Sequence, residues 1–182
     1  TLTAKEIILP RFPQTSPSAP SPVASTFSLP ELPVSVLLDE IKAEKITVGA
    51  PILGQELSFV LAGQAQLETG AGKVALNVTR LDRPKDTFAL AGGYSNTKRD
   101  LQLELSLTEA DGGLVSGLIG IPGAPSLALD ISGNAPIDDF TATISLDTDG
   151  SPRLSGDVTL KAAETSDSED NPSGQMNFAA DI

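Results

Sequence analysis

The side chains that most enzymes use for catalysis are scarce in this sequence. It contains no His, no Cys and no Trp, and only one Tyr. Imidazole acid–base chemistry, thiol nucleophiles and the commonest zinc ligands are therefore excluded. Among the carboxylates, Asp138 and Asp139 are adjacent, but neighbouring residues of a strand point to opposite faces, so they make a poor general acid–base pair. We expect no enzymatic activity, no catalytic residues and no cofactor.

Three further segments resemble ligand-binding loops only in part. Asp147–Gly150 begins like a calcium loop but lacks the further oxygen ligands and the bidentate Glu of an EF-hand, so a hairpin turn is favoured. Ser166–Asp170 is typical of a solvated loop tip. The sequence does not decide whether calcium binds at Asp147–Gly150 or at Ser166–Asp170. Ala91–Gly93 precedes a turn rather than a helix, which argues against a phosphate loop. We predict no metal site.

Charge is distributed unevenly along the chain. The formal net charge is −12, from 12 basic and 24 acidic residues. Residues 1–100 carry ten of each sign, whereas residues 101–182 carry fourteen acidic side chains against Arg153 and Lys161. An acidic excess repels phosphate backbones, so nucleic acid is not an expected partner. The excess favours a solvated acidic outer face over a site for a cationic partner.

The strongest pattern in the sequence is the alternation of apolar and polar residues, which is typical of half-buried β-strands. It is clearest in residues 101–108, where four Leu alternate with Gln, Glu, Ser and Thr. Turn sequences separate such runs, for example Asp111–Gly113 and Ser132–Asn134. The pattern predicts an all-β antiparallel meander with one apolar face, and one short helix near residues 113–121.

The chain divides into three parts. Residues 1–9 are strand-like and are expected to continue from upstream sequence. Residues 10–32 are rich in Pro and Ser and predict a mobile loop. Residues 33–182 hold the alternating runs, interrupted by an acidic loop at 164–173. Because neither a signal peptide nor a membrane anchor is evident, we expect the interior of a longer polypeptide.

Two architectures can use such strands. A filled sandwich or barrel buries its apolar faces and normally includes large aromatic residues, whereas aromatic residues make up only 4% of this chain. A long curved sheet can instead leave its aliphatic side open to something apolar. Composition alone leaves both alternatives open and slightly favours the filled core.

The segments Leu29–Val36 (LPELPVSV) and Ile46–Gly54 (ITVGAPILG) resemble the TamB-type translocation and assembly module proteins of Gram-negative envelopes. These proteins belong to the AsmA-like group of bridge-type lipid-transfer proteins. The similarity covers about residues 28–160 and lies in an ordered series of strand and turn segments. The series continues through Leu57–Gly63, Val74–Asp82, Thr97–Leu101, Leu105–Glu109, Gly112–Leu114, Leu118–Gly123, Leu127–Gly133, Ala135–Phe140 and Leu146–Gly150.

The resemblance implies an elongated curved β-groove in the periplasm, as a fragment of an envelope protein anchored in the inner membrane. Its expected function is lipid transport in outer-membrane biogenesis: carrying phospholipid, or guiding apolar outer-membrane cargo, between the two membranes. An outer-membrane barrel assembly factor would be met through other parts of the full-length protein. The alternative is a secreted or surface β-sandwich or repeat module for adhesion.

If the groove is correct, the alternating apolar residues form its concave wall and contact phospholipid acyl chains. The predicted lipid-binding residues are Leu57, Phe59, Leu61, Val74, Leu76, Val78, Leu101, Leu103, Leu105, Leu107, Leu127, Leu129, Ile131, Ile144 and Leu146.

Overall fold

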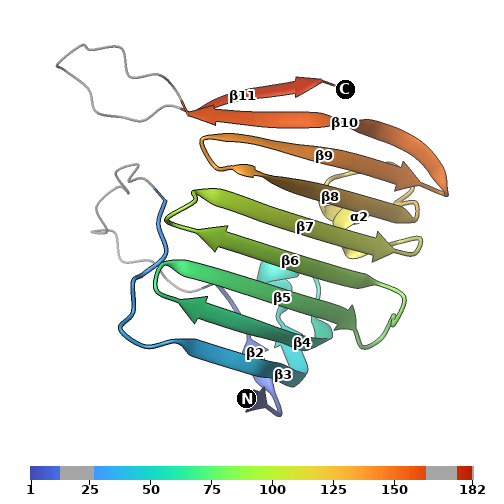
Figure 1. The fold of residues 1–182 in the computed structure, drawn as a ribbon. Coiled ribbons are helices and arrows are strands. Elements are labelled where there is room, and N and C mark those ends of the chain that lie inside the picture. The colour runs from blue at the N-terminus through green and yellow to red at the C-terminus, as the bar shows by residue number, and fades with distance from the viewer. Residues whose placement is uncertain (13–26, 163–175, 182) are drawn as a thin grey trace, which may run out of the picture.

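The computed structural model describes residues 1–12, 27–162 and 176–181, and it is all-β (Figure 1). Two very short helices, α1 (Ala50–Leu53) and α2 (Leu114–Leu118), lie between strands. The α2 helix confirms the short helix expected near residues 113–121, whereas α1 was not predicted. The strands are β1 (Leu2–Ala4), β2 (Ile7–Leu9), β3 (Val36–Val48), β4 (Leu57–Glu68), β5 (Ala71–Arg80), β6 (Thr87–Ser95), β7 (Asp100–Glu109), β8 (Leu127–Pro136), β9 (Asp139–Thr148), β10 (Ser151–Ala162) and β11 (Met176–Asp181).

All strands belong to one open, curved sheet. From β3 to β11 each strand pairs antiparallel with the next one along the chain, as a meander of short turns dictates. The sheet does not close into a barrel. The all-β class, the antiparallel meander and the open curved sheet are thus as predicted.

The N-terminal edge is built differently from the rest of the sheet. Residues 1–9 form two short strands instead of one, and both β1 and β2 pair with β3 in parallel. A parallel neighbour needs a crossover connection, and the long Pro-rich stretch after Leu9 separates β2 from β3. Residues 13–26 of that stretch, and the acidic loop predicted at 164–173, lie outside the described residues.

The α1 turn follows from its local sequence. Gly49 precedes the helix in an extended conformation, Pro51 occupies the first turn, and Gly54 ends the helix with φ +77°. Proline is tolerated in a first turn because its missing N–H would be unsatisfied there, and glycine adopts positive φ without steric cost. This Pro-then-Gly signature was present in the sequence but spans only one turn.

Strand register places the apolar side chains on one face of the sheet. Leu105, for example, lies opposite Leu90 of β6 and Ile131 of β8, whereas Glu104 lies opposite Ala91 and Ser132. The same phase holds from β4 to β9, because the ladders between these strands run without a register shift. The other face carries Ser, Thr, Gln, Ala and charged residues.

No second layer covers the centre of the apolar face in the described part of the chain. The described part of the chain has few buried hydrophobic residues, and they lie mainly near strand ends: Ala43, Leu57, Tyr94, Leu127, Phe140 and Ala142. The filled core that composition slightly favoured is therefore wrong, and the open alternative is correct. The physical reason is that all strands of the described residues belong to this one sheet, so none is left to form a second sheet against it.

Candidate apolar trough

The candidate functional site is the apolar face of β4–β9, which we call the trough. All of the predicted lipid-binding residues lie on this face. Leu57 and Leu127 are buried, and the others are half-buried. The central side chains form two rows that cross the strands at right angles. These rows are Leu61, Val78, Phe88, Leu107, Leu129 and Leu146, and Gly63, Leu76, Leu90, Leu105, Ile131 and Ile144.

A third row contains mostly small residues and lowers the surface of the trough beside the second row. At Gly92 an added Cβ would find its nearest atoms 3.7 Å away, so a side chain fits there in ordinary van der Waals contact. At Gly133 a Cβ would lie 2.6 Å from Cζ of Phe140, whose ring covers that position. The third row consists of Ala65, Val74, Gly92, Leu103, Gly133 and Ala142.

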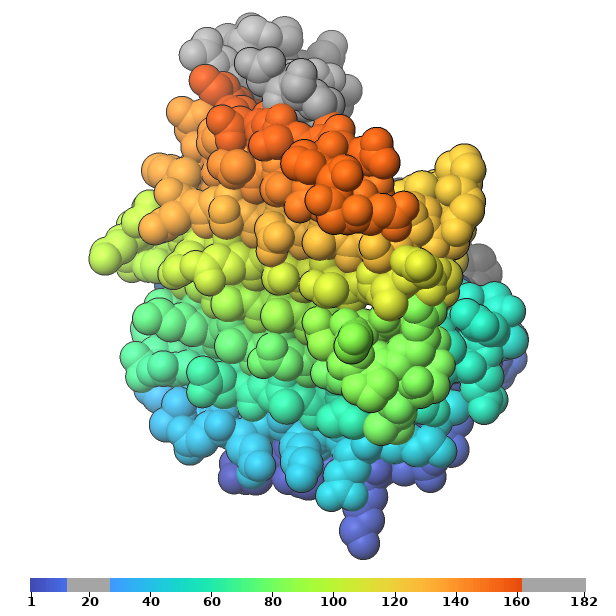
Figure 2. Space-filling model, turned by 90° about the vertical axis from the view of Figure 1, so that its right-hand side faces the viewer, coloured from blue at the N-terminus to red at the C-terminus, as the bar shows by residue number. Residues whose placement is uncertain are grey.

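The α2 helix bounds the trough at one end of the strands. Glu109 accepts hydrogen bonds from the backbone N–H groups of Val115 (2.9 Å) and Ser116 (3.2 Å), which fixes the start of α2. Leu114 and Val115 then line a cavity of about 180 Å³ together with Phe59 and other trough residues. In the space-filling view, α1 (teal) and the loop after α2 (yellow) project from the same side of the sheet (Figure 2).

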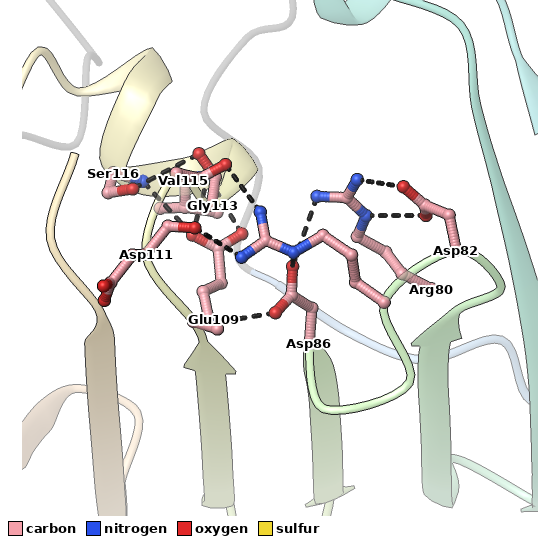
Figure 3. A network of polar contacts seen from close by, with 11 residues as sticks. Arg80, Asp82, Asp86, Glu109, Asp111, Gly113, Val115 and Ser116 are labelled. Carbon is pink, nitrogen blue, oxygen red and sulfur yellow. Dashed lines mark hydrogen bonds and ion pairs between the residues drawn. The ribbon is translucent and has the colours of Figure 1, made fainter.

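A buried ionic cluster anchors this end (Figure 3). Asp86 accepts from Nη1 of Arg80 and Nε of Arg83, both at 3.2 Å, and from the backbone N–H of Ala110 at 2.9 Å. Arg80 also donates two hydrogen bonds to Asp82, which is largely exposed. These bonds hold the pKa of the Asp82 carboxyl below its usual value and raise the pKa of Arg80.

Arg83 ties the cluster to the loop before α2. Its guanidinium donates to the backbone carbonyls of Asp111 (2.5 Å) and Gly112 (2.7 Å). Every buried side-chain N or O atom in the described residues has a hydrogen-bond partner. The cluster is thus satisfied internally, and it connects the β5–β6 loop to α2.

A short extended segment, Phe27–Pro33, bounds the opposite end of the trough; we call it the strap. Figure 1 shows it in blue, running past the strand ends on its way to β3. The Phe27 ring packs edge to face on Tyr94, with centroids 4.9 Å apart. The strap and the sheet line an open, almost wholly apolar pocket of about 300 Å³, whose lining includes Leu29, Leu67 and Leu101.

Sequence reasoning did not identify the cluster or the strap contacts, although one signal for the cluster was present. Arg80 falls in phase with Val74–Val78, and Glu109 falls in phase with Leu101–Leu107. A charged residue that continues an apolar alternation must point to the apolar face, where it needs a partner. No comparable signal marks Phe27 or Tyr94, because their contact joins segments far apart in the sequence.

The carboxylates that were candidates for catalysis or calcium binding form hydrogen bonds and ion pairs at turns in the structure. Asp149 and Gly150 adopt φ of +52° and +69° in the β9–β10 hairpin, and the Asp149 side chain accepts from the backbone N–H and hydroxyl of Ser126. Asp138 pairs with Arg99 at 2.6 Å, which lowers the pKa of that carboxyl. The described residues contain no group of three or more metal-ligating side chains. Ser166–Asp170 lies outside them.

The polar face becomes acidic toward the C-terminal strands. Glu104 of β7, Asp130 of β8, Asp147 of β9 and Asp157 of β10 all lie on it, in phase with Ser and Thr neighbours. These side chains are at least partly exposed. The arrangement fits the expected solvated outer face and keeps negative charge away from the trough.

Comparison with protein-family models, with curated proteins and with solved structures finds no match to this chain. Within the described ranges, no helix is long and apolar enough to cross a membrane. The trough is a continuous, partly exposed aliphatic surface, and its charged groups lie at its ends.

Proposed function

We propose that this chain is a segment of a periplasmic β-groove protein that carries phospholipid, or guides apolar outer-membrane cargo, between the inner and outer membranes. The main supporting observation is the unbroken apolar register across β4–β9, whose side chains stay partly exposed because no second layer covers them in the described residues. Contiguous exposed apolar surface of this kind marks a binding surface in a protein that stays in solution.

An acyl chain is the occupant whose chemistry fits best. The trough rows contain no charged side chain between the Arg80–Glu109 cluster and the strap, so nothing there would pair with a headgroup. Each methylene covered by the trough would contribute about 0.8 kcal/mol. Because the rows cross the strands, a chain lying along them would pass from β4 to β9, with its headgroup outside in water.

The resemblance to TamB-type proteins supports the same proposal and supplies its setting. Under this proposal the segment would lie in the periplasm of a Gram-negative envelope, within a longer protein anchored in the inner membrane. Contact with an outer-membrane barrel assembly factor would be made by other parts of that protein. The role is binding and guidance, and it requires no catalytic residue.

The direct test is extraction of lipid from the purified protein followed by mass spectrometry. We expect co-purified phospholipid, and we expect the delipidated protein to bind phosphatidylcholine carrying one pyrene-labelled acyl chain. A delipidated protein that folds but neither binds this probe nor binds a dye for exposed apolar surface would contradict the proposal.

A matched pair of glycine substitutions tests whether the trough itself is the binding surface. Gly92→Gln places a polar side chain in the third row of the trough, whereas Gly93→Gln places it on the opposite face beside Lys73 and Gln102. Neither glycine has a positive φ, and an added Cβ meets no atom closer than 3.6 Å, so both variants should fold. We expect Gly92→Gln to weaken binding of the pyrene probe at least fivefold and Gly93→Gln to leave it within twofold.

Circular dichroism and thermal unfolding of both variants serve as the control. If both glycine variants bind the probe equally well, acyl chains do not use the third row, and the placement of cargo in the trough is wrong.

A further inference from the structure

We propose that the strap is a displaceable occupant of the trough, which competes with an acyl chain for the wall beneath it. This inference rests on the proposed function and adds a regulatory element to it. The supporting observation is how the strap is attached. Its apolar side chains cover the trough wall, whereas its polar contacts within the described residues come from Tyr94 of β6 and Asn96 of the following turn.

The polar attachment of the strap consists of three hydrogen bonds. The Tyr94 hydroxyl donates to the backbone carbonyl of Phe27 at 3.1 Å. The Asn96 side chain receives the N–H of Leu29 and donates to its carbonyl, both at 2.8 Å. Asn96 thus imitates a strand neighbour for a single residue. All three bonds are between uncharged groups, each contributing only modestly to a folded protein.

The strap has no further backbone ladder to the sheet. Among the described residues, no backbone–backbone hydrogen bond outside the strands involves residues 27–35, and Pro30 and Pro33 lack the N–H that a ladder needs. The Phe27 side chain is 52% exposed although it lies against Tyr94. Because the pocket between the strap and the sheet is open, the strap covers the wall incompletely, and it is held at few points.

The two ends of the trough differ in this respect. At the α2 end, buried carboxylates bind the backbone of the loop and of α2: Asp86 accepts from Ala110, and Glu109 accepts from Val115 and Ser116. At the strap end, release would expose neutral groups that water can satisfy. The side chains of Phe27 and Leu29 would leave the wall, which includes Leu67 and Tyr94, and an acyl chain offers that wall equivalent apolar contact.

A reversible cross-link tests the competition. An added Cβ at Gly72 would lie 3.0 Å from Cδ1 of Leu29, and the chain has no native cysteine. A Leu29→Cys/Gly72→Cys double variant can therefore be locked with a short, reducible thiol–thiol cross-linker. We expect the locked form to bind the pyrene-labelled phosphatidylcholine at least tenfold more weakly than the same protein after reduction.

The possible outcomes separate the two proposals. Equal binding by the locked and reduced forms would overturn the strap proposal while leaving the trough as the binding surface. If neither the wild type nor either form of the double variant binds the probe, the trough is not an acyl-chain binding surface, and the strap proposal fails with it.

Asn96→Ala gives a second test that does not alter the wall. Loss of two of the three hydrogen bonds should free the strap, so the variant should bind the probe three- to tenfold more tightly. Because Tyr94 is the only tyrosine and there is no tryptophan, its emission reports on strap contact directly. We expect acrylamide to quench Tyr94 more strongly in lipid-free Asn96→Ala than in the wild type; unchanged quenching and unchanged affinity would argue that the strap is fixed.

Discussion

Replacing Asp86 with Ala should lower the free energy of unfolding by about 1.5–3 kcal/mol, because a buried hydrogen bond to a charged group contributes about this much and Arg80 would keep only its more exposed partner Asp82. The Asp86 side chain is 2% exposed and that of Arg80 is 7% exposed, so water cannot replace the lost carboxylate. The variant would also remove the acceptor for the Ala110 N–H and one partner of Arg83. Since natural domains have only about 5–15 kcal/mol in total, much of the protein should be unfolded at moderate urea concentrations.

Asp82→Ala is the matched control for Asp86→Ala. Asp82 also bonds Arg80, but its side chain is 55% exposed, and exposed ion pairs contribute only about 0–1 kcal/mol. Urea unfolding followed by circular dichroism should therefore give a midpoint close to that of the wild type for Asp82→Ala and a much lower one for Asp86→Ala. Similar midpoints for the two variants would show that burial of the cluster does not govern its stability.

The role of the cluster explains why the trough can remain uncovered. A single sheet has little buried apolar area, so its ends need other means of fixing the connecting loops. Here the buried charges of Arg80, Asp86 and Glu109 hold the β5–β6 loop and α2 in place without covering the central rows. The stabilising contacts lie at the rim, and the aliphatic surface stays available.

Most of the strands and their faces could be predicted from the sequence, because alternation is a local property. The turn predicted at Ser132–Asn134 is wrong, since these residues lie within β8. Residues 101–108 show it without interruption, and the register places Leu101–Leu107 on the apolar face as expected. Alternation specifies which face is apolar but not what lies over that face. Whether the sheet stays single or packs on a second one depends on contacts that a local pattern does not contain.

The bounding elements of the trough could be predicted only in part. Arg80 and Glu109 are detectable as charges in an apolar phase, but their joint partner Asp86 sits in a loop with no periodicity. The strap contacts join Phe27 and Leu29 to residues 67 positions further along the chain, through hydrogen bonds that no spacing rule anticipates. The parallel pairing of β1 and β2 was missed for the same reason.

Replacing Leu105 with Asp should weaken acyl-chain binding, with a loss of at least tenfold in affinity for the pyrene-labelled phosphatidylcholine. Leu105 lies in the second row between Leu90 and Ile131, so cargo along the trough must pass over it. Covering an unpaired carboxylate with hydrocarbon removes its water, and tenfold corresponds to only about 1.4 kcal/mol of that cost. Isothermal titration or pyrene fluorescence measures the loss.

Two further variants, Leu105→Ala and Glu104→Lys, serve as controls for Leu105→Asp. Leu105→Ala shortens the side chain without adding charge and should weaken binding only two- to threefold. Glu104→Lys reverses a charge on the polar face, next to Ala91 and Ser132, and should leave binding unchanged. Because Leu105 is half-buried, Leu105→Asp should still fold, with a stability loss within the usual range of about 0.5–3 kcal/mol. If Glu104→Lys impairs binding as much as Leu105→Asp while both remain folded, cargo does not distinguish the two faces, and the trough is not its path.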